Sequence, residues 1–175
     1  MKLFKLMSAV LLVNVIMASC GNDSNSKEEV TISDTAGTAI AGNAQVEEDK
    51  KLEANKEIAR NFIQSLYGDK DSTAVDKYVA EDIKQHDPIL KDGKQWLREL
   101  TRQLLSNPNF EKTKIDIKYI NAEDDMVWTL IREAAPNGKV FARVEIYRIR
   151  DQKIVERWLI SQPEPRNSEN KNTMF

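Results

Sequence analysis

The chain has 175 residues, 41% of them apolar, which is enough for one domain with a packed core. Its 26 basic side chains do not outnumber its 28 acidic ones, so the composition argues against nucleic acid as a partner. The sequence has no glycine-rich phosphate loop, no Cys/His metal cluster and no serine-nucleophile motif, so it predicts neither a metal nor an organic cofactor.

Residues 1–19 have the features of an export signal. Two lysines precede an apolar run of about a dozen residues, too short for a membrane span of roughly 20. Cys20, the sole cysteine, follows Met17-Ala18-Ser19, and this arrangement resembles a bacterial lipoprotein signal in which Cys20 carries the lipid, such as palmitate. The alternative is a free thiol after an ordinary signal peptide. We expect a protein of the cell envelope that is lipid-anchored to a bacterial membrane, either periplasmic or surface-exposed.

The segment after the cysteine predicts a flexible tether over residues 20–47, because it is polar and has no apolar periodicity. Residues 164–175 are similarly polar and predict a C-terminal tail. The folded domain is therefore expected over residues 48–163.

Three helices are expected in the first half of this domain. The first covers residues 48–67, and a shorter second helix covers 71–80. Asp92 and Gln95 fit a capping box that opens a third helix, which ends at Asn107-Pro108. The apolar face of the first helix carries Ile58, Ala59, Phe62, Ile63 and Leu66.

Four strands are expected in the second half, over residues 112–120, 126–134, 140–150 and 153–162. Pro136-Asn137-Gly138 is a strong hairpin signal, and Asp151-Gln152 is a weaker one. Helices followed by an antiparallel meander predict an α+β domain, with the helices packed on one face of a bent sheet.

Three stretches resemble the SnoaL-like branch of the nuclear-transport-factor-two-like superfamily, which includes polyketide cyclases. They are NKEIARNFIQSLYGDKDSTAVDKYVAEDIKQHDPIL (55–90), VEIYRIRDQKIVERW (144–158) and ISQPEP (160–165). The resemblance implies a cone-shaped barrel, in which three N-terminal helices close a curved antiparallel sheet around a pocket for a small organic ligand. In the cyclases, an aspartate on the last strand acts as general acid or base beside histidines, without a cofactor.

The closing E-H-W-D pattern of that family reads Glu156-Arg157-Trp158-Leu159 in this chain. Arginine stays protonated at ordinary pH and leucine has no proton to transfer, so neither replacement can perform acid–base catalysis. The mechanism of the cyclases therefore does not carry over intact.

His86 and Glu145 are the remaining candidates for a catalytic role. His86 matches the Gln-His-Asp/Asn-Pro position of the family, where it either faces the pocket or bonds nearby backbone or Asp87. Glu145 shares a strand face with Tyr147, and it is either a carboxyl of raised pKa or an ion-pair partner of one of three arginines. The three arginines are Arg132, Arg143 and Arg157.

The expected ligand-binding residues come from the last three strands. They either line the pocket or pack in the core, and Trp158 is expected on the other side of its strand. The residues are Trp128, Leu130, Arg132, Tyr147, Arg157 and Leu159.

Two functions follow from these expectations. The first is a lipid-anchored module that binds a small apolar or weakly polar organic ligand without turning it over. The alternative is a cofactor-free isomerase, cyclase or hydratase that uses His86 and Glu145. A homodimer through the sheet face is a third possibility for such a fold.

Overall fold

The structure is a computed structural model that describes residues 35–108, 111–135 and 137–175, with side chains from residue 43 onward. The fold belongs to the unit Ala36–Phe175. The expected signal segment, the lipidation site Cys20 and the first part of the expected tether lie outside the described residues, as does Pro136.

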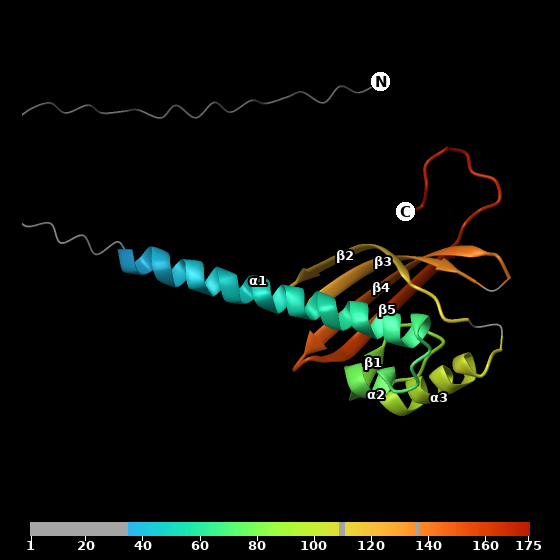
Figure 1. Ribbon diagram of the computed structural model, residues 1–175, viewed down its shortest axis with the longest axis horizontal. Coiled ribbons are helices and arrows are strands. Elements are labelled where there is room, and N and C mark those ends of the chain that lie inside the picture. Colours follow the sequence, from blue (N-terminus) through green and yellow to red (C-terminus); the bar gives the residue numbers. More distant parts are fainter. Residues whose placement is uncertain (1–34, 109–110, 136) are drawn as a thin grey trace, which may run out of the picture. The chain divides into compact units, whose positions relative to one another are not determined.

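Helices come first and most strands follow, which confirms the α+β prediction (Figure 1). The five strands form one sheet in the order β1-β5-β4-β3-β2. In chain order the elements are α1 (Thr35–Ile63), a π-helical turn η1 (Gln64–Gly68), α2 (Ala74–Tyr78), β1 (Val79–Gln85), α3 (Lys94–Leu105), β2 (Asp116–Glu123), β3 (Met126–Ala134), β4 (Val140–Arg150) and β5 (Lys153–Pro163).

The antiparallel meander of β2 to β5 is confirmed. Gly138, at a φ of 77°, stands in the expected hairpin turn, and its N–H donates to the Ala135 carbonyl at 2.9 Å. Asp151 and Gln152 also adopt positive φ in the tight β4–β5 turn. The four strands expected from local patterns are not the whole sheet, because β1 adds a fifth strand that pairs parallel to β5. β1 is a polar edge strand with a bulge, so it lacks a clear apolar alternation.

The helices differ from their expected bounds. α1 begins at Thr35, so residues 35–47, expected as flexible tether, are helical; four alanines in this part favour a helix. The expected second helix ends at Tyr78, where the chain turns into β1. The capping box is also wrong, because the Asp92 carboxylate accepts from the Gln85 backbone N–H at 2.8 Å and leaves α3 without a side-chain cap.

The core lies between α1 and the inner face of the sheet. Ala59, Phe62, Ile63 and Leu66 are buried, which confirms the apolar face expected for the first helix. The Phe62 ring meets the Tyr147 ring edge-to-face with centroids 5.9 Å apart. Among the helices that the structure describes, none combines the length and apolar character needed to cross a membrane.

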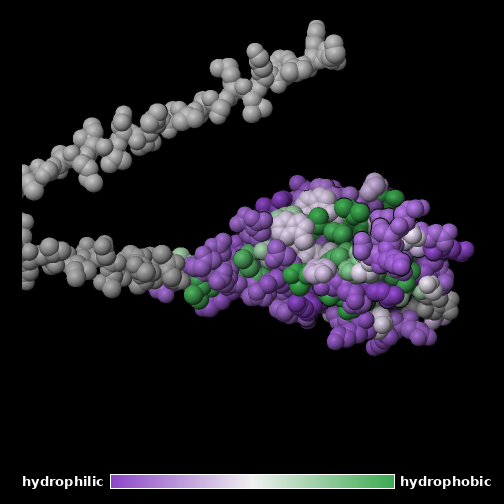
Figure 2. Space-filling model, turned by 90° about the horizontal axis from the view of Figure 1, so that it is seen from above, coloured by the Kyte–Doolittle hydropathy of each residue, from purple (hydrophilic) through white to green (hydrophobic). Residues whose placement is uncertain are grey.

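Strand register divides the side chains between an inner and an outer face of the sheet. Thr129, Glu145 and Leu159 stand opposite one another on the inner face, whereas Trp128, Ile146 and Trp158 do so on the outer face. Figure 2 views the molecule from the side of the sheet, and apolar side chains gather there within a polar surround. Tyr119 and Ile160 remain exposed, at 67% and 62%.

Candidate functional site

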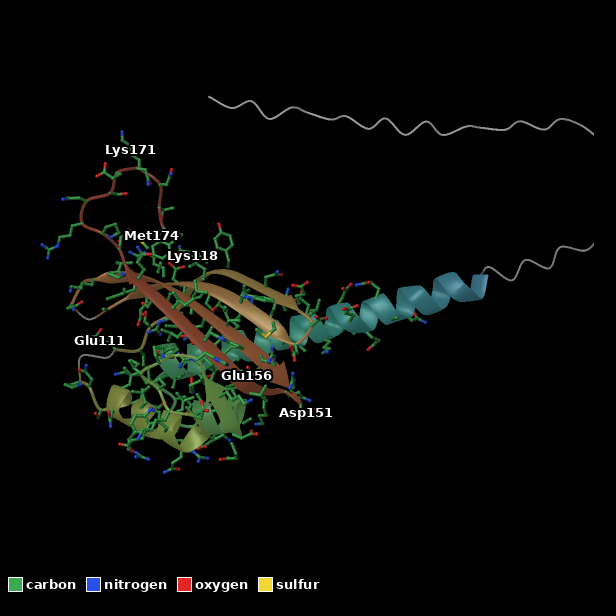
Figure 3. The ribbon with its side chains drawn as sticks, turned by 180° about the vertical axis from the view of Figure 1, so that it is seen from behind. Glu111, Lys118, Asp151, Glu156, Lys171 and Met174 are labelled. Atoms are coloured by element: carbon green, nitrogen blue, oxygen red, sulfur yellow. The ribbon has the colours of Figure 1, made fainter. Side chains whose placement is uncertain are left out.

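A cavity of about 910 Å³ lies where η1, the end of α3 and the start of β2 approach the β3–β4 turn. Glu111, one of the lining residues, marks this end of the fold, and Asp151 in the β4–β5 turn lies at the opposite end (Figure 3). Apolar walls come mainly from Ile63, Leu104, Ile115 and Ile131. The charged lining residues balance, with Lys114, Arg132 and Arg143 against Glu111, Asp116 and Glu133.

Gln64 in η1 hydrogen-bonds to the backbone of the cavity wall that precedes β2. Its amide donates to the Thr113 carbonyl at 3.1 Å and accepts from the Ile115 N–H at 3.0 Å. The Gly68 carbonyl also accepts from the Thr113 N–H at 2.9 Å. A side chain at Gly68 would bring its Cβ within 2.6 Å of the Thr113 carbonyl oxygen and against Gln64, so this close approach requires glycine.

A buried ion pair occupies the inner face of the sheet behind the cavity. Arg157 Nε donates to a Glu145 carboxylate oxygen at 2.8 Å, and the two residues are 2% and 0% exposed. The Tyr147 hydroxyl donates to the same oxygen at 2.5 Å, and the Thr129 hydroxyl donates to the Glu145 backbone carbonyl at 2.9 Å. The expected ion-pair alternative for Glu145 is therefore present in the fold.

Three residues that line the cavity connect it to this ion pair: Tyr67, Glu133 and Arg143. Arg143 Nη1 lies 3.3 Å from the second Glu145 oxygen, and its Nε lies 3.0 Å from Glu133. The Arg143 guanidinium stands 5.0 Å from the centre of the Tyr67 ring. Arg157 Nη2 donates to the Tyr67 hydroxyl oxygen at 2.9 Å. We call these six residues the inner cluster: Tyr67, Glu133, Arg143, Glu145, Tyr147 and Arg157.

Electrostatics keep Glu145 ionised. Burial by itself raises the pKa of Glu145, but the Arg157 and Arg143 charges and two hydrogen bonds outweigh it, so the pKa lies below its ordinary value. The raised pKa considered for this carboxyl is wrong, because two guanidinium groups face it. Burial raises the pKa of Tyr67 despite the opposing charge of Arg157, so its hydroxyl stays protonated.

The sequence comparison identifies the fold family. Residues 59–157, more than half of the chain, match the SnoaL-like domain. The chain belongs to the SnoaL-like family. No curated protein is similar enough in sequence to be matched.

Solved structures resemble the SnoaL-like domain at low sequence identity. An NTF2-like protein of unknown function from Mesorhizobium loti has a TM-score of 0.54 at 20% identity, covering 64% of this chain and 93% of that one. One from Burkholderia xenovorans LB400 has a TM-score of 0.52 at 20% identity, covering 66% and 88%. An LEH-like epoxide hydrolase from M. tuberculosis has a TM-score of 0.52 at 14% identity, covering 64% and 85%. These similarities show the nuclear-transport-factor-two-like fold.

His86 does not face the inner cluster of the SnoaL-like domain. Its ring stacks on the Trp158 ring, with centroids 4.2 Å apart and planes 2° from parallel. Its Nε2 lies 3.2 Å from a Glu156 carboxylate oxygen, and its side chain is 39% exposed. Trp158 and Glu156 alternate with Arg157 along β5, so His86 and Glu145 lie on opposite faces of the sheet. The condition for joint catalysis by these two residues is not met.

The expected lining residues separate into three groups. Trp128 and Leu130 lie on the outer face with Ile146 and Val144, so placing them in the pocket was wrong. Arg132 shares that side of its strand but lines the cavity at the strand end, where its guanidinium also lies 5.9 Å from the centre of the Phe175 ring. Tyr147, Arg157 and Leu159 face inward but do not line the cavity. Trp158 lies on the outer face, as expected.

Sequence reasoning missed Tyr67 as a site residue. It stands at the end of the expected first helix, where the run Ile58 to Leu66 explains the apolar face without it. Its partner Arg157 is 90 positions away, and no local spacing links the two. Across the described ranges, no three His, Cys, Asp or Glu side chains gather in an arrangement that could hold a metal ion.

Proposed function

We propose that this SnoaL-like domain binds a small, mainly apolar organic compound in its cavity and does not turn it over. The observation that carries the proposal is a cavity of about 910 Å³ with both apolar and charge-balanced polar walls, which ends on an internally bonded cluster. Ligand sites are typically concave and mostly apolar, with a few polar groups that orient the ligand.

The same cluster argues against the enzymatic alternative. Glu145 has no proton to donate as a general acid, because Arg157 and Arg143 hold it ionised. It is also poorly placed as a general base, because both carboxylate oxygens are already bonded within the cluster and Glu145 does not line the cavity. Arg157 and Leu159 stand where the family's closing pattern has titratable residues, and His86 is on the other face of the sheet. Passive binding is therefore the function that fits these residues best.

The binding proposal is tested with 2-isopropenylnaphthalene, a neutral apolar probe. We expect it to raise the melting temperature of the purified domain, because a ligand that binds only the folded state stabilises it. Ala134→Trp should weaken binding at least about tenfold, because Ala134 lines the cavity at an exposed position and an indole there narrows the space open to the probe. Isothermal titration calorimetry measures both affinities.

The matched control is Ala54→Trp, which places the same indole on an exposed position of α1 outside the cavity. It should leave the affinity within about twofold of the unmodified protein. Equal affinities of the Ala134→Trp and Ala54→Trp proteins would contradict binding in this cavity. Solvent deuterium found in a bound ketone after incubation would revive the enzymatic alternative.

We also propose that the domain is exported and held at a bacterial membrane by a lipid on Cys20. The support is the sequence of residues 1–20, a short apolar run followed by Met-Ala-Ser-Cys. Cells expressing the full chain with labelled palmitate should incorporate the label, and Cys20→Ser should abolish both labelling and recovery in the membrane fraction. A Cys20→Ser protein that stays in the membrane fraction would refute the lipid anchor.

A further inference from the structure

Tyr67 joins two features of the inner cluster. Its side chain lines the cavity, and its hydroxyl oxygen accepts a hydrogen bond from Arg157 Nη2 at 2.9 Å. No other residue lines the cavity and bonds to Arg157 among those described. Tyr67 is thus the residue through which Arg157 contacts any molecule in the cavity.

The Tyr67 hydroxyl can still donate a hydrogen bond. A phenol has one O–H donor and two acceptor lone pairs, and a guanidinium has donors only. The bond from Arg157 therefore uses the oxygen, and the hydroxyl hydrogen must point elsewhere. Among the described residues, Arg157 is the sole hydrogen-bond partner of this hydroxyl.

Arg157 also strengthens this donor. Glu145 fixes the guanidinium at 2.8 Å, so a buried cation is held beside the phenol oxygen. A cation that donates to the oxygen polarises the O–H bond and makes its hydrogen a better donor. Because the pKa of Tyr67 is raised by burial, the hydroxyl remains a donor across the physiological pH range.

The charge of the inner cluster limits what this donor can bind. Arg143 and Arg157 are balanced by Glu133 and Glu145, each within 3.3 Å of a guanidinium nitrogen. Lys114 and Arg132, which also line the cavity, are offset by Glu111 and Asp116. An anionic ligand would therefore lose its hydration without meeting a net positive charge, and beside Tyr67 it would lie close to Glu133. A neutral acceptor carries no such cost.

We propose that Tyr67 donates its hydroxyl hydrogen to the carbonyl oxygen of a neutral, mainly apolar ligand, and so selects ketones and esters over hydrocarbons of the same shape. This role rests on the proposed binding function and assigns a chemical class to its ligand. Tyr67 acts by hydrogen bonding alone, and no covalent step is involved.

The test compares two probes of nearly equal shape, 2-acetylnaphthalene and 2-isopropenylnaphthalene, which differ by a carbonyl oxygen in place of a methylene. Tyr67→Phe should weaken the ketone about five- to tenfold and leave the hydrocarbon within about twofold, because one hydrogen bond is lost. The control Tyr119→Phe removes the hydroxyl of an exposed residue outside the cavity and should change neither affinity.

A vibrational measurement on the unmodified protein gives an independent result that does not depend on any variant folding. The stretch of a 13C-labelled carbonyl in bound 2-acetylnaphthalene should fall below its frequency in hexane, and Tyr67→Phe should return it toward the hexane value. A bound carbonyl that absorbs as in hexane, or an equal loss of both probes in Tyr67→Phe, would overturn the role of Tyr67.

The outcomes also separate this role from the binding function itself. If both probes bind the unmodified protein and Tyr67→Phe leaves the ketone affinity unchanged, the cavity binds ligands but Tyr67 does not select them. If neither probe binds, the proposed binding function fails, and the selection by Tyr67 fails with it.

Discussion

Arg157→Leu is expected to lower the free energy of unfolding by about 3–5 kcal/mol, because it leaves the Glu145 carboxylate buried without its closest cation. The loss includes the hydrogen bond to Tyr67. Urea unfolding at pH 7, followed by circular dichroism, measures the change.

Arg150→Leu is the matched control, since Arg150 pairs with Asp125 at 3.0 Å on the surface of the same sheet. Its side chain is 59% exposed, and an exposed ion pair contributes under about 1 kcal/mol. Adding Glu145→Leu to Arg157→Leu should recover part of the lost stability, because the stranded charge is then removed. If Arg157→Leu and Arg150→Leu lower the free energy of unfolding by similar amounts, the buried ion pair stabilises the fold no more than the exposed one does.

Glu145→Gln is expected to lower the free energy of unfolding by about 2–4 kcal/mol at pH 7, because Arg157 and Arg143 then face a neutral amide. The difference should shrink on acidification. The pKa of Glu145 in the folded state lies below its ordinary value of 4.5. Its carboxylate therefore stabilises the fold above about pH 4.5, and this contribution is lost as the pH falls through the folded-state pKa.

Urea unfolding of Glu145→Gln and the unmodified protein from pH 7 to pH 3 checks this dependence. Glu53→Gln serves as control, because Glu53 forms an exposed pair with Lys56 on α1. The stability of Glu53→Gln should run parallel to that of the unmodified protein. A Glu145→Gln difference that grows toward low pH would contradict an ionised Glu145.

The sequence predicted best those strands that are rich in β-branched and aromatic residues and lie next to a clear turn. β3 and β4 have the expected bounds, and β5 extends one residue further than expected. β2 begins four residues later and ends three residues later than the expected strand 112–120. Local patterns did not predict β1, because its pairing with β5 joins residues over 70 positions apart and its own residues are mostly polar. Local patterns hold no information on such a pairing.

The sequence predicted which site residues share a face within one strand, but not which faces of neighbouring strands lie together. Alternation within β4 correctly grouped Glu145 with Tyr147 and Arg143, because that grouping needs one strand only. The assignment of Trp128 to the pocket failed because it required the register of β3 against β4, where a shift of one residue exchanges the two faces. His86 was left open for the same reason, since its face depends on pairing with β5.

The bonds from Gln64 hold Thr113 and Ile115 in place on one wall of the cavity. The chain before Thr113 therefore tolerates sequence changes that the chain after it does not. Pro108 and Glu111 border the cavity between the end of α3 and Thr113 and belong to no strand, so the chain length there can change while the strands keep their register. Insertions before Thr113 would then change the size of the cavity. The selection of a neutral carbonyl that we propose depends on the inner cluster, which such insertions do not alter.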